Sequence, residues 1–80
     1  MISDAEKERL IVGVKQAVKA VKENRAAKIF LANDCESRIS APLEQAALAG
    51  ETDIFYIDTM KELGTMCGID VGASCAVVLK

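Results

Sequence analysis

The stretch KIFLAND, residues 28–34, is the part of the sequence that determines the class of fold. Residues 29–32 are continuously apolar, which is typical of a strand that is covered on both faces. Asn33 and Asp34 then form a polar turn. Three further runs have strand character: Leu10–Val12, Ile54–Ile57 and Ala73–Leu79. The sequence therefore predicts a sheet of about four strands.

Helical signals alternate with these runs along the chain. Ser3 and Glu6 form an S-x-x-E capping box, which predicts a short helix that runs to about Arg9. Apolar residues then recur at the three- and four-residue spacing of one helical face: Val14, Ala17, Val18 and Val21. This second helix is expected to stop near Asn24.

Two more helices are predicted in the second half of the chain. The segment from about Ser37 to Ala49 is expected to be helical, with Pro42 in its first turn and Gly50 as the glycine that follows its end. A second capping box, from Thr59 to Glu62, opens a short helix. Three glycines are then expected to punctuate a flexible stretch: Gly64, Gly68 and Gly72.

Regular alternation of helices and strands predicts an α/β fold, a three-layer α/β/α sandwich. The chain has 80 residues, so we expect a single domain over residues 1–80. There are no internal repeats or linkers.

The composition excludes several classes of function. The chain has no histidine, the commonest acid–base catalyst and zinc ligand, and no glycine-rich phosphate loop. We therefore expect no enzyme, no cofactor, no metal site and no small-molecule substrate. The three cysteines, Cys35, Cys67 and Cys75, are odd in number and are read as small buried apolar side chains. They indicate a reducing, cytoplasmic setting, and no apolar stretch is long enough for a membrane helix.

Charge is distributed unevenly along the chain, although the net charge is only −2. Residues 15–28 carry a local charge of +4, and the rest of the chain carries −6. Lys15, Lys19 and Lys22 lie at i, i+4 and i+7, so they project from one stripe of the second helix. A phosphate at the start of this helix would bind both Lys15 and the free backbone N–H groups. The alternative is that these lysines form an ordinary solvated face.

Three more features have both a structural and a functional interpretation. Gly13 is either a turn residue with positive φ or a place where a ligand approaches the backbone, and Gln16 beside it has a donor and an acceptor for a base edge. Asn33 and Asp34 follow a central strand, where α/β sheets bind ligands, but turn chemistry explains them equally well. The apolar residues of GIDVG, residues 68–72, either form a contact surface or fold back on the core.

These residues together resemble a known family. The pattern G-x-K-Q-x-x-K at residues 13–19, the run AKIFLANDC at residues 27–35 and the pattern L-G-x-x-x-G-I-x-V at residues 63–71 resemble the kink-turn RNA-binding ribosomal proteins, the L7Ae/L30e superfamily, including its small bacterial members. The likeness extends from about Leu10 to Leu79.

The resemblance implies an α/β/α domain with a mixed sheet that grips the bent internal loop of an RNA kink-turn. The segment that matches residues 13–19 lies against tandem sheared G·A pairs in this family, with Lys15 and Gln16 facing base edges and Lys19 contacting backbone and bases. The loop that matches Ile69, Asp70 and Val71 cradles the flipped-out nucleotide. With Lys22 from the lysine stripe and Asn33 from the strand end added, the residues expected to contact RNA are Gly13, Lys15, Gln16, Lys19, Lys22, Asn33, Ile69, Asp70 and Val71.

The function predicted is non-catalytic recognition of kink-turn RNA by a monomer, in or associated with the ribosome. The alternative is a protein–protein interaction module with weak or lost RNA binding, in which Ile69 and Val71 form the contact. The acidic total charge favours this alternative.

Overall fold

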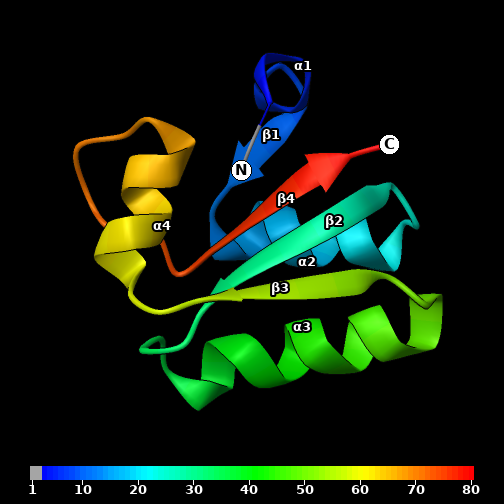
Figure 1. Ribbon diagram of the computed structural model, residues 1–80. Coiled ribbons are helices and arrows are strands. Elements are labelled where there is room, and N and C mark those ends of the chain that lie inside the picture. The colour runs from blue at the N-terminus through cyan, green and yellow to red at the C-terminus, as the bar shows by residue number, and fades with distance from the viewer. Residues whose placement is uncertain (1–2) are drawn as a thin grey trace.

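The computed structural model describes residues 3–80, in which helices and strands alternate (Figure 1). In chain order the elements are α1 (Asp4–Lys7), β1 (Leu10–Val12), α2 (Val14–Lys22), β2 (Ala26–Ala32), α3 (Ser37–Gly50), β3 (Asp53–Ile57), α4 (Met60–Cys67) and β4 (Cys75–Leu79). All four predicted strands are present, and α1 is shorter than predicted because it ends at Lys7.

The strands form one mixed sheet in the order β1-β4-β2-β3. The pair β2 and β3 is parallel, whereas β4 is antiparallel to both of its neighbours, β1 and β2. The mixed sheet implied by the family resemblance is thus confirmed. Since β1, β2 and β3 point the same way, their carboxyl ends and the amino end of β4 lie at one edge of the sheet.

Helices cover both faces of this sheet, which confirms the predicted three-layer sandwich. On one face α2 and α3 pack over Ile29, Leu31 and Val77. On the other face α4 packs over Phe30 and Val78. The alternation of Ile29 and Leu31 with Phe30 explains why β2 is apolar at every position from residue 29 to residue 32, since each face has its own core.

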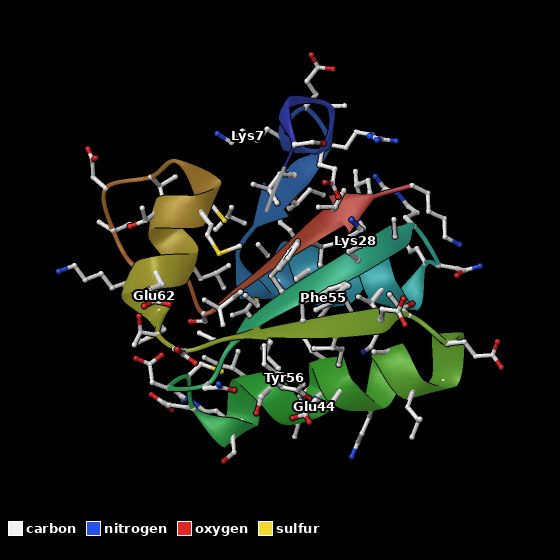
Figure 2. The ribbon with its side chains drawn as sticks, viewed as in Figure 1. Lys7, Lys28, Glu44, Phe55, Tyr56 and Glu62 are labelled. Carbon is white, nitrogen blue, oxygen red and sulfur yellow. The ribbon has the colours of Figure 1, made fainter. Side chains whose placement is uncertain are left out.

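The second face is covered only in part. Figure 1 shows α4 at one side of it and α1 at the far end of β1. Phe55 on β3 lies over the part of this face that neither helix covers (Figure 2), 45% exposed, and its ring packs on that of Phe30 with the centroids 5.6 Å apart.

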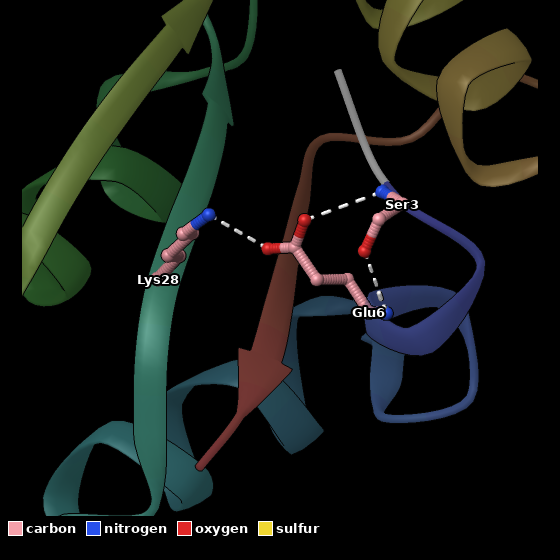
Figure 3. A network of polar contacts seen from close by, with 3 residues as sticks. All are labelled: Ser3, Glu6 and Lys28. Atoms are coloured by element: carbon pink, nitrogen blue, oxygen red, sulfur yellow. Dashed lines mark hydrogen bonds and ion pairs between the residues drawn. The ribbon is translucent and has the colours of Figure 1, made fainter.

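A small polar network holds α1 against the sheet (Figure 3). Glu6 Oε2 accepts a hydrogen bond from Lys28 Nζ on β2 at 2.7 Å. The predicted capping box is also present, because the Ser3 N–H donates to Glu6 Oε1 and the Glu6 N–H donates to Ser3 Oγ, both at 3.2 Å. The Lys28 ammonium and the Ser3 N–H together lower the pKa of Glu6 to about 2.

Two predictions about α3 were wrong. Because α3 begins at Ser37, Pro42 is its sixth residue and lies in the second turn, not the first. Gly50 is the last helical residue, and it is Glu51 that adopts the left-handed conformation, with φ 55°. The Thr52 N–H donates to the Ala47 carbonyl at 2.9 Å, a bond that closes the helix end around Glu51.

The prediction for Gly64 was also wrong. Gly64 is a buried residue inside α4, not part of a flexible stretch. The capping box that precedes it is confirmed on its threonine side, since Thr59 Oγ1 accepts from the Glu62 N–H at 3.0 Å. Asn24, with φ 59°, follows the end of α2 as predicted.

Candidate nucleic-acid interface

Three segments that are distant in sequence meet at the edge where β1 and β2 end and β4 begins. The Gly13 N–H, after β1, donates to the Cys75 carbonyl at 3.3 Å, and the Ala32 N–H, at the end of β2, donates to the Ser74 carbonyl at 3.0 Å. The loop of residues 68–74 leads directly into β4. The start of α2, the turn at Asn33 and the apolar loop therefore lie at the same edge.

Gly13 joins β1 to α2 in a conformation that only glycine adopts readily. Its φ is 125° and its ψ is 149°, and a Cβ built on it would have no atom within 4 Å. The positive-φ interpretation is confirmed, and the open space beside the backbone leaves room for a ligand. Gly13 has no side chain to cap α2, and the first turn of α2 contains no acidic residue. The positive end of the helix dipole thus has no carboxylate from the first turn of α2 itself.

Lys15, Gln16 and Lys19 line one hollow of about 320 Å³. Its wall also contains Arg25, which follows the end of α2 and was not among the predicted contact residues. The position of Arg25 in the basic segment 15–28 was the available signal. The Arg25 guanidinium lies 3.1 Å from the Glu23 carboxylate, and both side chains are about half exposed.

The lysine stripe of α2 is present but extends away from the edge. Lys15, Lys19 and Lys22 all border one broad, open depression beside Pro42. Lys22 is the last residue of α2, about 12 Å along the axis from its first residue. It also lines a second hollow, between α2 and α3, that Lys15 and Lys19 do not reach. Lys22 is therefore the member of the stripe farthest from Gly13.

The basic segment 15–28 does not act as one surface. Lys28 is ion-paired with Glu6 on the opposite face of the sheet from α2. The basic charge at the edge itself comes from Lys15 and Lys19, and Arg25 lines their hollow from the start of β2, at the opposite edge of the sheet.

The loop of residues 68–72 is a projecting surface. Val71 is 70% exposed and Ile69 is 37% exposed, so the interpretation in which they cover the core is wrong. Asp70 between them is exposed. The loop lies directly against α4, because a Cβ on Gly64 would lie only 2.1 Å from the Val71 carbonyl oxygen. Gly64 is therefore needed for the position of the loop.

Asn33 and Asp34 have different roles. Asp34 Oδ1 accepts from the Met60 N–H at 2.8 Å and so fixes the start of α4 against the end of β2. The Asn33 N–H donates to the Ile57 carbonyl at 2.7 Å, and its exposed side chain is at the same edge as Gly13. Asp34 thus has the turn role, and Asn33 remains a candidate for contact with a ligand.

The three cysteine thiols are wholly or partly buried, and their pKa values are raised. Cys75 is fully buried, and burial raises the pKa of its thiol to about 11. Burial also raises the pKa values of Cys35 and Cys67, which are half-buried. Within residues 3–80 no group of three His, Cys, Asp or Glu side chains is placed to hold a metal ion. Over the same residues no helix has the length and apolar character needed to cross a membrane.

Residues 3–80 match the model of the Ribosomal protein L7Ae/L30e/S12e/Gadd45 family. The chain belongs to this family. Its relatives in the L7Ae family include a protein named as an RNA-binding protein from Caldanaerobacter subterraneus subsp. tengcongensis, 47% identical over 66 residues, which are 82% of this chain and 80% of the relative. Another, also named as an RNA-binding protein, is from Halalkalibacterium halodurans and is 38% identical over 71 residues, which are 89% of this chain and 87% of the relative.

Solved structures have the same L7Ae fold. The 15.5kD RNA binding protein of Giardia lamblia superposes with a TM-score of 0.84 at 23% identity over 91% of this chain, which spans 62% of the Giardia protein. A protein of unknown function from Bacillus halodurans also superposes with a TM-score of 0.84, at 20% identity, over 95% of this chain and 76% of its own.

Proposed function

We propose that this L7Ae-family protein binds RNA and that its target is the kink-turn. The observation that carries the proposal is the meeting of Gly13, the basic start of α2 and the exposed Ile69–Val71 loop at one edge of the sheet. A bent internal loop has backbone phosphates and a splayed-out base close together, and this edge has a partner for each. The names of the two bacterial relatives agree with an RNA partner.

Each part of the edge has a separate role in the proposal. Lys15 and Gln16 face base edges at the G·A pairs, Lys15 also binds a phosphate at the start of α2, and Lys19 contacts phosphate and base. Gly13 lets the RNA approach the backbone, and Asn33 adds a polar contact beside it. Ile69 and Val71 pack on the flipped-out base, with Asp70 between them. Lys22, at the far end of α2, contributes through its charge alone.

The protein is proposed to be a monomer with no catalytic activity, located in the cytoplasm and either ribosomal or associated with the ribosome. The lack of histidine and the raised thiol pKa values support a non-catalytic role. The unpaired cysteines support a reducing compartment.

Gel-shift titration distinguishes binding that is specific for kink-turn RNA from binding to RNA in general. The protein is titrated against a kink-turn RNA and against the same RNA with its tandem G·A pairs replaced by Watson–Crick pairs. We expect the intact kink-turn to bind at least about tenfold more tightly, a difference of about 1.4 kcal/mol. Equal binding to both RNAs would contradict kink-turn recognition, and no binding to either would contradict RNA binding.

The second candidate is a protein-interaction module that uses Ile69 and Val71. The 70% exposure of Val71 favours it, because a large apolar side chain on a loop tip often marks a contact surface. Affinity capture from the native host with and without nuclease separates the two functions. A partner retained by the protein after nuclease treatment, and absent with Val71→Ser, would favour this candidate.

A further inference from the structure

The strand β3 forms an open side of the sheet with two exposed aromatic side chains. Among residues 3–80 its one strand neighbour is β2. Phe55 is 45% exposed and Tyr56 is 52% exposed, on opposite faces of the strand. The strand sequence DIFYI contains no lysine or proline, the residues that commonly prevent pairing at an edge.

On the side away from β2, β3 has backbone N–H and C=O groups that no strand among residues 3–80 pairs with. The Ile57 carbonyl accepts from the Asn33 N–H, so the backbone groups of Ile57 point toward the β2 side. Backbone groups alternate in direction from residue to residue along a strand. The N–H and C=O of Ile54 and Tyr56 therefore point outward, and a chain laid beside β3 would bond to them.

A shallow hollow of about 400 Å³ runs along the same strand. Phe30 and Phe55 line it with Lys28 on the face that α1 and α4 leave partly uncovered, where Figure 2 shows Phe55. On the other face the Tyr56 hydroxyl donates to Glu44 Oε2 at 3.0 Å, which holds its ring against α3. The hollow can therefore take apolar side chains from alternate residues of an added strand.

Acidic side chains lie around the free edge of β3. The strand contains Asp53, Glu51 precedes it, Asp58 follows it and Glu44 faces it from α3. Residues 34–62 contain seven acidic and two basic side chains. The ion pairs found among residues 3–80 are Arg25–Glu23, Lys28–Glu6 and Arg38–Glu36, so these four carboxylates have no cationic partner there.

The acidic charge around β3 indicates which kind of molecule can bind at its free edge. RNA is repelled by four unpaired carboxylates, and a second copy would bring two sets of them together. A basic strand is attracted by the same carboxylates. We infer that the free edge of β3 binds an extended, basic segment of a partner protein, which adds as a fifth strand beside Asp53–Ile57. The site lies along the side of the sheet, so RNA at the strand ends and a peptide on β3 can be bound together.

Titration of ¹⁵N-labelled protein with synthetic heptapeptides tests this site by NMR. The probe has alternating Lys and Val. One control peptide alternates Lys and Pro, which keeps the charge and removes the N–H donor at every second residue, and another alternates Glu and Val. We expect the Lys–Val peptide to shift amide signals of residues 53–57. We expect the Lys–Pro peptide to bind at least about tenfold more weakly and the Glu–Val peptide not to bind.

A matched pair of charge reversals completes the test. Asp53→Lys is expected to weaken binding of the Lys–Val peptide at least about fivefold, whereas Glu8→Lys, exposed beyond α1, leaves it unchanged. A kink-turn RNA should not shift residues 53–57. Equal affinity for the Lys–Val and Lys–Pro peptides, an equal effect of both reversals, or peptide shifts confined to α2 would overturn the inference. Dimerisation through residues 53–57 in sedimentation and NMR dilution experiments would also overturn it, in favour of a second copy.

Discussion

At Gly13 the chain passes from β1 into α2 with a backbone conformation that is almost closed to other residues. The side chain that is missing there would neither clash nor pack, because nothing lies within 4 Å of its position. Any destabilisation on substitution thus comes from backbone strain, and any decrease in RNA affinity comes from the same strain or from the added volume.

Gly13→Ala is expected to reduce the free energy of unfolding by about 1–3 kcal/mol, the usual strain of a non-glycine residue at such φ and ψ values. Urea denaturation monitored by circular dichroism measures it. The matched control is Gly50→Ala, because Gly50 is helical and a Cβ there would lie 3.5 Å from Thr52 Oγ1. That control should be neutral or stabilising by up to about 1 kcal/mol. If Gly13→Ala leaves the free energy of unfolding unchanged, the turn at residue 13 accommodates alanine without strain.

Single residues also mark where prediction from sequence was limited. The positive φ of Gly13 was predictable, because a glycine between a strand and a helix commonly serves as a turn residue. The left-handed Glu51 was not, because Gly50 beside it is the better residue for that conformation. The bonds from the Glu51 and Thr52 N–H groups to α3 close the helix end one residue later, and the residue type of Glu51 gives no signal of this.

Among the elements, α1 is short, and Glu6 connects it to β2 through Lys28. The pKa of Glu6 is about 2, well below its ordinary value of 4.5, because Lys28 and Ser3 donate hydrogen bonds to the carboxylate. A depressed pKa means that the interaction contributes stability above about pH 4.5 and that this contribution disappears as the pH falls toward 2.

Glu6→Gln is therefore expected to lower the unfolding midpoint in urea at pH 7 and to make stability less dependent on pH between about 5 and 2. Denaturation series at pH 7, 4.5 and 3 measure the difference between variant and parent, which should shrink as the pH falls. Glu8→Gln, with an exposed side chain that makes no hydrogen bond among residues 3–80, is the control and should follow the parent. A Glu6→Gln deficit that is constant with pH would show that packing, not charge, holds α1.

The contact between α4 and the loop 68–72 depends on Gly64. A methyl group there would lie 2.1 Å from the Val71 carbonyl oxygen, so the loop backbone must move. Gly64→Ala is expected to cost about 1–3 kcal/mol in stability and to displace Ile69 and Val71. Kink-turn binding should then weaken by more than it does in Val71→Ala, which shortens one side chain and leaves the backbone in place. Urea denaturation and gel shifts on both variants measure this.

The helices and strands were largely predictable because each has a local signal. The apolar runs indicated the strands, and the capping residues Ser3 and Thr59 indicated two helix starts. Gly64 was misassigned because glycine is a poor helix former, and its reason for being in α4 is a neighbour seven residues later in the chain. Such close approaches follow from tertiary packing alone.

In the whole molecule, the direction of β4 determines whether the loop of residues 68–72 lies at the same edge of the sheet as Gly13. If β4 were parallel to its neighbours, the loop before it would lie at the edge opposite to Gly13. The apolar pattern of a buried strand is the same in both directions. The mixed sheet was therefore predicted from the family resemblance and not from the hydrophobic pattern. Which lysines share the edge also needed the structure, since Lys22 and Lys28 belong to the same basic segment and lie farther away.

Basic and acidic side chains are separated across the molecule. The edge with Lys15 and Lys19 is basic within a chain of net charge −2, whereas the residues around β3 are acidic. Removing one lysine–phosphate interaction should reduce the slope of log K against log[salt] by about 0.7–0.9. Lys15→Ala and Lys19→Ala should each weaken RNA binding and lower this slope. Lys7→Ala, in α1 at the opposite end of β1, should leave the affinity and the slope unchanged.

Filter-binding titrations of one kink-turn RNA over a series of salt concentrations measure the slopes. If all three variants bind more weakly by the same factor and keep the parent slope, the lysines of α2 form a solvated face and RNA is held elsewhere.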